Sequence, residues 1–303
     1  MTDPLRALRT PEARFDHLPG YAFAPHWVDD LEGCEGLRIH RVDEGPTDAA
    51  RTFLCLHGQP TWSYLYRRMI PLFAATGARV VAPDLLGFGR SDKPSEEGVY
   101  TFMFHREMLR RLVERLDLRN VVLVVQDWGG LLGLTLPMAA PERYAGLLVM
   151  NTAFGTGDQP LGPGFLDWRA FNRRNPDLAV GKLLARACPH LAPAEAAAYD
   201  APFPDASYKA GVRRFPELVP DRPDAEGAAL SRKARAWFGS EWTGRTFMAI
   251  GMQDPVLGPP AMHAVAAAIR GCPPPFEVAE GGHFLQEWGE RVAPAALAAF
   301  APG

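Results

Sequence analysis

Several features are scarce or missing in this chain of 303 residues, and each absence excludes a class of protein. Its four cysteines lie far apart with no CxxC pair, so neither a zinc site nor a disulfide framework is indicated. The 32 basic and 35 acidic residues leave a net charge of -3, which does not suggest binding to nucleic acid or to an anionic membrane. No apolar run approaches the roughly 18 residues of a membrane span. We expect no metal, no nucleic-acid partner and no membrane association.

An export signal is also missing. Residues 1–20 carry scattered charges and lack the apolar segment of about 7–15 residues that a secretory signal contains. This composition favours a cytoplasmic protein.

Strand-forming runs alternate with segments of helical period along most of the chain. The alternation is typical of a mostly parallel sheet flanked by helices, and the length suits one large α/β domain with an insertion. The expected strands are 52–56, 79–82, 121–125, 146–150, 246–250 and 276–278, preceded by an edge hairpin in YAFAPHWVDD and GLRIHRVDEG. The expected helices are 63–75, 102–116, 129–139, 261–270 and 286–299.

The alternation stops after Asn151. Residues 155–228 are rich in proline, alanine and charge, with helical patches but no good strand. A structureless loop of that length would be improbable in a compact domain. We therefore expect a helical cap domain at 155–228, inserted into a main domain formed by 1–154 and 229–303. An insertion there would overhang the carboxyl ends of the strands, where open α/β sheets bind ligands.

The stretch VVLVVQDWGG (121–130) ends an apolar strand with a carboxylate, an indole and two glycines. A strand, a sharp turn with one functional residue and a helix that begins at small residues describe a nucleophile elbow. The usual motif is G-x-S-x-G, which occurs nowhere in this chain, and its absence argues against a serine esterase or lipase. We predict Asp127 as the nucleophile; the alternative for an aspartate at a strand end is a helix N-cap.

Two further strand ends supply partners for Asp127. Asp254 follows the apolar strand in MAIGMQD, and His283 follows the next strand in VAEGGHF. Nucleophile, acid and histidine in this chain order are the order of the triad in this fold. Taken singly, Asp254 could be a turn residue and His283 a loop histidine. The rival acid position after strand 146–150 holds Asn151, which is uncharged, so the acid role falls to Asp254.

The strand in FLCLHGQP leads into a fourth functional loop. In a nucleophile-elbow fold, this loop and the residue after the nucleophile each give one backbone N–H to an oxyanion hole. We assign these donors to Gln59 and Trp128. His57 is expected to be structural, because it lies where the loop must be held.

These segments together resemble one known family. HGQPTWSYLYR, PDLLGFGRSDKP, VVQDWGG, AIGMQD and GGHF are similar to segments of the haloalkane dehalogenases of the α/β-hydrolase superfamily. The likeness covers nearly the whole chain, and the cap segment YDAPFPDASYKAGVRRFPELV shares it. It implies the α/β-hydrolase fold, with a mostly parallel eight-stranded sheet flanked by helices and an inserted helical cap. Asn151 with Asp254 resembles the subfamily that takes its acid from the later strand.

The resemblance also implies a reaction. Asp127 would displace halide from a haloalkane to give an alkyl ester, which water activated by His283 and Asp254 would hydrolyse to a primary alcohol. The expected partners are a small haloalkane, water and a halide ion, with no cofactor, and the chain is expected to be a monomer. One departure is Gln59, where the family's familiar residue is glutamate. Because a backbone N–H serves there, we expect little loss.

The departing halide needs hydrogen-bond donors that carry no fixed charge, and the indole N–H is a donor only. Trp128, beside the nucleophile, is one such donor, and the resemblance places Trp168 of the cap as the second. The other tryptophans are expected to be core residues. By similarity of position, the remaining pocket wall is expected to include Leu131, Phe165, Phe215 and Pro216.

Two alternatives remain at this point. Epoxide hydrolases also use an aspartate elbow with the sequence D-W-G-G, and they need cap phenols, for which Tyr199 and Tyr208 are available. The other alternative is a non-catalytic binding protein on the same fold.

Overall fold

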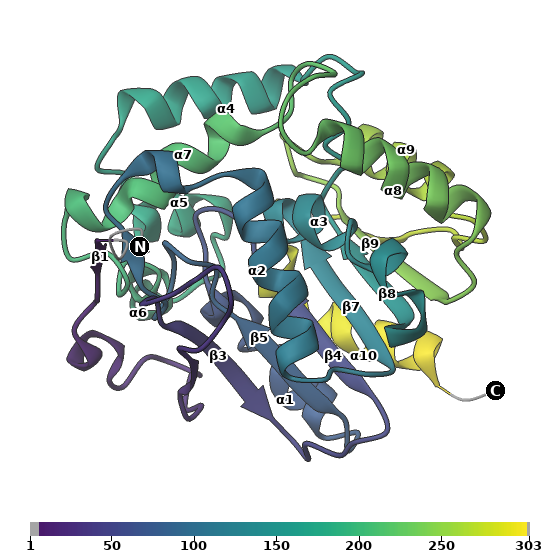
Figure 1. The fold of residues 1–303 in the computed structure, drawn as a ribbon, viewed down its shortest axis with the longest axis horizontal. Helices are drawn as coiled ribbons and strands as arrows, with labels where there is room; N and C mark the ends of the chain where they lie inside the picture. The colour runs from purple at the N-terminus through teal and green to yellow at the C-terminus, as the bar shows by residue number, and fades with distance from the viewer. Residues whose placement is uncertain (1–5, 302–303) are drawn as a thin grey trace.

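The computed structural model describes residues 6–301 (Figure 1). Within this range one sheet has eight strands in the order β10-β9-β8-β7-β4-β5-β3-β2. Strands β4, β5, β7, β8, β9 and β10 run parallel, and at one edge β3 pairs antiparallel with both β5 and β2. The strands are β2 His26–Val28, β3 Ile39–Glu44, β4 Thr52–Leu56, β5 Arg79–Pro83, β7 Val121–Gln126, β8 Tyr144–Met150, β9 Arg245–Gly251 and β10 Phe276–Val278. The predicted strands and the edge hairpin are confirmed, and the fold is the α/β-hydrolase fold.

The helices of the main domain cover both faces of this sheet. They are α1 Ile70–Ala74, α2 Phe102–Arg115, α3 Asp127–Gly133, α8 Ala228–Ser240, α9 Pro259–Ala268 and α10 Gly289–Phe300. Helix α2 lies in front of the sheet in Figure 1, whereas α1 and α10 pack together behind it. Every residue of β4 and of β7 is buried, as expected for strands covered on both faces.

Three predicted helices are shorter than expected. The segment 63–75 divides into a 3-10 turn, Ser63–Tyr66, and helix α1. The segment 129–139 divides into α3 and a 3-10 turn, Pro137–Ala139, because Pro137 cannot donate the hydrogen bond that would continue α3. The last predicted helix likewise starts as a 3-10 turn, Leu285–Trp288. The sequence did not predict a two-residue ladder between β1, Ala7–Leu8, and β6, Lys93–Pro94.

Four helices lie between β8 and α8, in the segment expected to form the cap. They are α4 Pro163–Arg174, α5 Val180–Ala187, α6 Pro193–Ala198 and α7 Ala210–Leu218. Figure 1 shows them gathered at one end of the molecule, at the end of β7 from which α3 starts. This arrangement supports a cap over the carboxyl ends of the strands; its limits at 155 and 228 stay a prediction.

Two absences hold for the described part of the chain. Between residues 6 and 301 no helix has both the length and the apolar character that a membrane crossing requires. In the same range, no three His, Cys, Asp or Glu side chains are grouped so that they could hold a metal ion.

Candidate active site

Asp127 lies at the sharp bend where β7 ends and α3 begins. Its φ of +48° is in the left-handed region, which costs a residue other than glycine roughly 1–2 kcal/mol. Two contacts with the end of β8 hold this backbone: the Asp127 N–H donates to the Asn151 carbonyl at 3.0 Å, and Thr152 Oγ1 donates to the Asp127 carbonyl at 2.7 Å. Strain held in this way at one residue is typical of a functional site.

Two glycines make room for this bend. A Cβ on Gly129 would overlap the Leu56 carbonyl oxygen, so only glycine lets α3 start this close to β4. A Cβ on Gly58 would lie 2.8 Å from Cγ of Asp127 and nearer still to its Cβ. The loop after β4 therefore lies directly against the Asp127 carboxylate.

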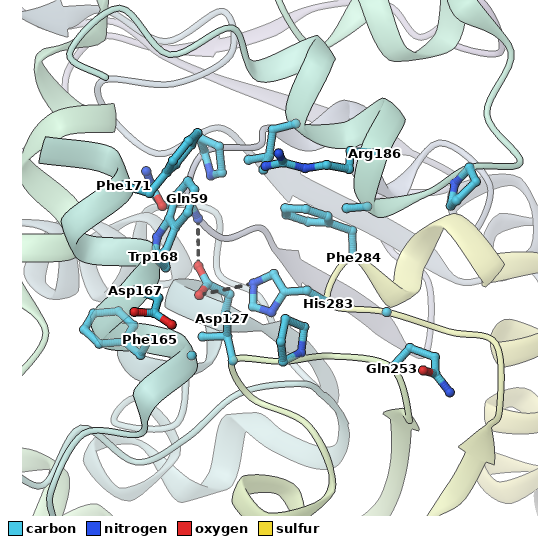
Figure 2. A pocket seen from close by; sticks show the side chains of 18 of the residues that line it. Gln59, Asp127, Phe165, Asp167, Trp168, Phe171, Arg186, Gln253, His283 and Phe284 are labelled. Atoms are coloured by element: carbon cyan, nitrogen blue, oxygen red, sulfur yellow. Dashed lines mark hydrogen bonds and ion pairs between the residues drawn. The ribbon is translucent and has the colours of Figure 1, made fainter. Parts of the chain in front are cut away.

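The structure brings together Asp127, His283 and Asp254, which come from three separate strand ends. Figure 2 shows Asp127 and His283 facing one another. His283 Nδ1 is hydrogen-bonded to Asp254 Oδ2 at 2.8 Å, and its Nε2 lies 3.6 Å from Asp127 Oδ2. The other Asp127 oxygen, Oδ1, accepts the backbone N–H of Gln59 at 2.8 Å. The carboxylate thus has one oxygen held by the predicted oxyanion donor and the other facing the histidine.

The electrostatics of the group follow from these contacts. Burial alone would lower the pKa of His283, but the charge of Asp254 and its hydrogen bond, together with the nearby Asp127 carboxylate, raise it to about 10. Burial would raise the pKa of Asp254, but the charge and hydrogen bond of His283, with the N–H groups of Val256 and Leu257, hold it below its usual value. The carboxylates on either side therefore favour the protonated form of the imidazole.

Asn151 belongs to this site, although the sequence only marked it as an unsuitable acid. Its Nδ2 donates to Asp254 Oδ2 at 2.9 Å, and its Oδ1 accepts the Gly251 N–H at 2.8 Å. The residue is fully buried, and it ties the end of β8 to the loop that carries the acid. An amide is suited to this position because it donates to a carboxylate and accepts from a backbone N–H at once.

Gln126 is a second residue that the sequence analysis missed. Its Nε2 donates to the His283 carbonyl at 3.0 Å, so the residue before the nucleophile holds the loop of the histidine. The sequence signal for this role was a glutamine at the end of an otherwise apolar strand. A polar side chain buried there, as Gln126 is, needs a hydrogen-bond partner.

His57 has a structural role, as expected. Its Nε2 accepts the Leu85 N–H at 2.9 Å, and its Nδ1 bonds the Gly58 carbonyl at 2.9 Å.

A cavity of about 620 Å³ opens above Asp127 and His283. Cap residues and main-domain residues line it together, among them Phe165, Trp168, Phe171, Leu183, Val256 and Phe284. Its charged lining residues besides Asp127 and His283 are Asp167, Arg186 and Glu280, and Figure 2 shows Asp167 and Arg186 on opposite sides of the carboxylate.

Of the four predicted wall residues, Phe165 lines the cavity, whereas Leu131, Phe215 and Pro216 are buried and are not among its lining residues. Phe215 packs instead into a cluster of rings, with centroids 4.8 Å from those of Trp128, Phe88 and His105. Leu131 and Phe215 belong to the hydrophobic core, which similarity of position did not reveal.

The two predicted halide donors lie in different surroundings. Trp168 lines the cavity, whereas Trp128 is only 3% exposed and packs on Phe215. Within residues 6–301 neither indole N–H is paired with a protein acceptor, in contrast to Trp242, whose Nε1 donates to Thr246 Oγ1 at 3.0 Å. A missing acceptor does not by itself mark a halide donor, since the buried Trp62 Nε1 has none within these residues either. Trp128 is not among the residues that line the cavity.

The cap tyrosines that an epoxide hydrolase would need do not reach the cavity. Tyr199 is fully buried and its hydroxyl donates to Glu287. Tyr208 packs against the hydrophobic core, and neither phenol is among the lining residues.

Comparisons with known proteins show the fold and the family of the chain. The family model described as alpha/beta hydrolase fold matches residues 51–290. A haloalkane dehalogenase of Psychrobacter cryohalolentis is 45% identical over 296 residues, 95% of this chain and 96% of its own length. Haloalkane dehalogenase 1 of Mycobacterium tuberculosis is 46% identical over 92% of this chain and 93% of its own. The tetrameric structure of haloalkane dehalogenase DpaA from Paraglaciecola agarilytica superposes with a TM-score of 0.95, at 52% identity, covering 97% of this chain and 98% of that one.

Proposed function

Because the chain belongs to the haloalkane dehalogenase family of the α/β-hydrolase fold, we propose that Asp127, His283 and Asp254 carry its hydrolysis of carbon–halogen bonds. Its sequence is 45% identical to that of the Psychrobacter haloalkane dehalogenase and 52% identical to that of the Paraglaciecola enzyme, over nearly the full length of the chain. The protein is therefore a haloalkane dehalogenase. The observation that carries the assignment of residues is the Asp127 carboxylate, presented on a left-handed bend with Oδ2 3.6 Å from Nε2 of His283.

In the first step, Asp127 Oδ2 attacks the carbon that bears the halogen. The new C–O bond forms as the carbon–halogen bond breaks, and the halide leaves with the bonding electron pair. Oδ2 is the better placed oxygen, because Oδ1 is already engaged by the Gln59 N–H at 2.8 Å. A carboxylate suits displacement at a saturated carbon because it is already anionic and forms an ester that water can remove.

In the second step, water attacks Cγ of the ester while His283 Nε2 takes its proton. The oxyanion develops on Oδ1, where the Gln59 N–H already donates and the Trp128 N–H at the start of α3 is the second donor. Collapse of this intermediate breaks the bond to the alkyl oxygen, and the alcohol leaves with the proton that His283 holds. The second water proton then passes from the new carboxyl group of Asp127 to His283, which restores the carboxylate. One water oxygen remains in Asp127.

The charges of the site set the timing of these steps. With both carboxylates ionised, the pKa of His283 is about 10, so the imidazole is protonated and cannot act as a base. Esterification removes the negative charge of Asp127, and one of the groups that raise this pKa is lost. His283 can then release its proton and serve as the base in the alkyl-enzyme.

The unpaired indole N–H groups of Trp128 and Trp168 would hold the departing halide. Each supplies a donor without a fixed positive charge, so the ion is stabilised as it forms and is still released. Trp168 comes from the cap and Trp128 from the main domain, and halide binding therefore spans the two.

The acid lies after the later strand, β9, and the position after β8 holds Asn151, which donates to the acid at 2.9 Å. These positions support a place in the subfamily with the acid at the later strand.

The proposed substrates are small haloalkanes that fit a largely apolar cavity of about 620 Å³. The Paraglaciecola relative has a tetrameric structure, so the expected monomer stays a prediction, which light scattering checks. The cytoplasmic location also stays a prediction.

Incubation with 1,2-dibromoethane and, separately, with styrene oxide tests the function. Bromide and 2-bromoethanol from the first, without diol from the second, are expected. Diol from the epoxide without bromide from the alkane would instead favour an epoxide hydrolase, and no product from either would favour a binding protein.

A further inference from the structure

A proline inside cap helix α7 leaves one backbone carbonyl without its helical partner. Pro216 has no N–H, so the carbonyl of Val212, four residues earlier, cannot receive the hydrogen bond that would continue the helix. An orphaned buried carbonyl needs another donor. Val212 is fully buried, so that donor must come from the protein.

Two side chains from different parts of the molecule supply it. Gln59 Nε2, from the loop after β4, donates to the Val212 carbonyl at 2.9 Å. Asn172 Nδ2, from cap helix α4, donates to the same oxygen at 3.2 Å. Gln59 and Asn172 are buried residues, 4% and 2% exposed, so neither bond is exchanged readily with solvent.

Each of these two donors lies in a segment that also carries a residue proposed to act in the reaction. The backbone N–H of Gln59 holds Oδ1 of Asp127, where the oxyanion forms. Asn172 is one helical turn beyond Trp168, and residues four apart share a helix face. The oxyanion loop and the helix of the cap indole therefore meet at one carbonyl.

We propose that the Val212 carbonyl, freed by Pro216, is the point that positions the oxyanion loop through Gln59 and the halide-binding helix through Asn172. Gln59 and Asn172 are positioning residues in this scheme, and the inference rests on the proposed roles of the Gln59 N–H and of Trp168. It also explains why Gln59 is an amide. An ionised glutamate has no hydrogen to donate to a carbonyl, and it would add a charge beside Asp127.

The test separates the two arms in the full-length protein. Gln59→Met keeps the backbone N–H and the side-chain length but removes the donor, and we expect hydrolysis of the alkyl-enzyme to slow about tenfold. Its bromide dissociation constant should stay within about twofold of wild type. Asn172→Leu should show the reverse: bromide binding about fivefold to tenfold weaker, with hydrolysis within about twofold of wild type. A general loss of packing would move both quantities in both variants.

Pro216→Ala provides the third arm, because the alanine restores a backbone N–H that can donate to the Val212 carbonyl and compete with both side chains. We expect this variant to slow hydrolysis and to weaken bromide binding together. The matched control is Pro294→Ala, which changes a proline inside α10, outside the site, and should alter neither.

Wild-type hydrolysis in Gln59→Met, or wild-type values of both quantities in Pro216→Ala, would overturn the inference. If thermal melting shows that Gln59→Met is unfolded, Gln59→Leu takes its place. The same slowing is expected, and a wild-type rate of hydrolysis would again contradict the inference. These results differ from a failure of the proposed function, in which wild type itself would release no bromide burst and form no adduct on Asp127.

Discussion

Nε2 of His283 lies 3.6 Å from Oδ2 of Asp127, and its Nδ1 bonds Asp254 Oδ2 at 2.8 Å. One imidazole therefore faces the proposed nucleophile on one side and the acid on the other. In the two-step scheme this histidine acts as a base only after the ester has formed. Changes to it should therefore affect hydrolysis of the ester and spare the release of halide.

Replacing His283 by glutamine should stop the cycle after its first half. His283→Gln cannot take a proton from water, so hydrolysis should slow by about 10²–10⁴-fold while Asp127 still attacks. We expect one bromide per enzyme and an accumulated alkyl adduct, measured by intact-protein mass spectrometry with 1-bromobutane. Asp127→Asn is the matched control and should give neither bromide nor adduct. An unmodified His283→Gln protein after bromide release would contradict the scheme.

The pH dependence of the two steps should differ. The pKa of His283 is raised to about 10 in the free enzyme, so its protonated form prevails below that pH. In the ester one carboxylate charge is gone, the pKa falls, and hydrolysis should rise with pH and level off well below pH 10. Stopped-flow rates of ester hydrolysis and NMR titration of His283 in the free enzyme measure the two values. A hydrolysis rate that keeps rising to pH 10 would contradict the proposed timing.

Removing the amide of Asn151 should affect the second step and stability. Asn151→Ala leaves the buried Gly251 N–H without an acceptor and takes one donor from Asp254, which should lower the free energy of unfolding by about 1–3 kcal/mol. A less firmly held acid should also slow hydrolysis of the ester, with the bromide burst preserved. Chemical denaturation and single-turnover kinetics check the two effects. Loss of the burst with hydrolysis intact would count against the positioning role.

The indole of Trp168 should matter through its N–H. Trp168→Phe keeps an aromatic ring but removes the donor, and a hydrogen bond to a charged group is worth roughly 1.5–3 kcal/mol. We therefore expect bromide to bind about 10- to 100-fold more weakly, as measured by isothermal titration calorimetry. Trp237→Phe, which removes an indole that packs on Phe238 away from the cavity, should leave the affinity unchanged. Equal effects of both substitutions would refute the halide role.

Local sequence signals were sufficient for the sheet and for the three residues proposed as the triad. A run such as 121–125 is apolar because both faces of its strand are covered, and a polar residue at its end is conspicuous for the same reason. Parallel strands bring their carboxyl ends to one edge, so Asp127, Asp254 and His283 could be placed together without knowledge of the strand order.

The side-chain directions in the cap were beyond such signals. Phe215 was expected in the wall but packs in the core, whereas Leu183 lines the cavity. Which face of a short helix meets the cavity depends on how the cap helices pack, and the apolar pattern is the same on either side. Asn151 and Gln126 were missed because their partners lie about 100 or more residues away in sequence.

The central claim is that Asp127 itself becomes alkylated and is then hydrolysed at its own carbonyl carbon. A single turnover in water enriched in ¹⁸O, followed by peptide mass mapping, tests this most directly. We expect one heavy oxygen in the peptide that holds Asp127 and ordinary oxygen in the first alcohol released. Label in that alcohol, with none in the peptide, would mean that water attacks the haloalkane directly and that Asp127 is not alkylated.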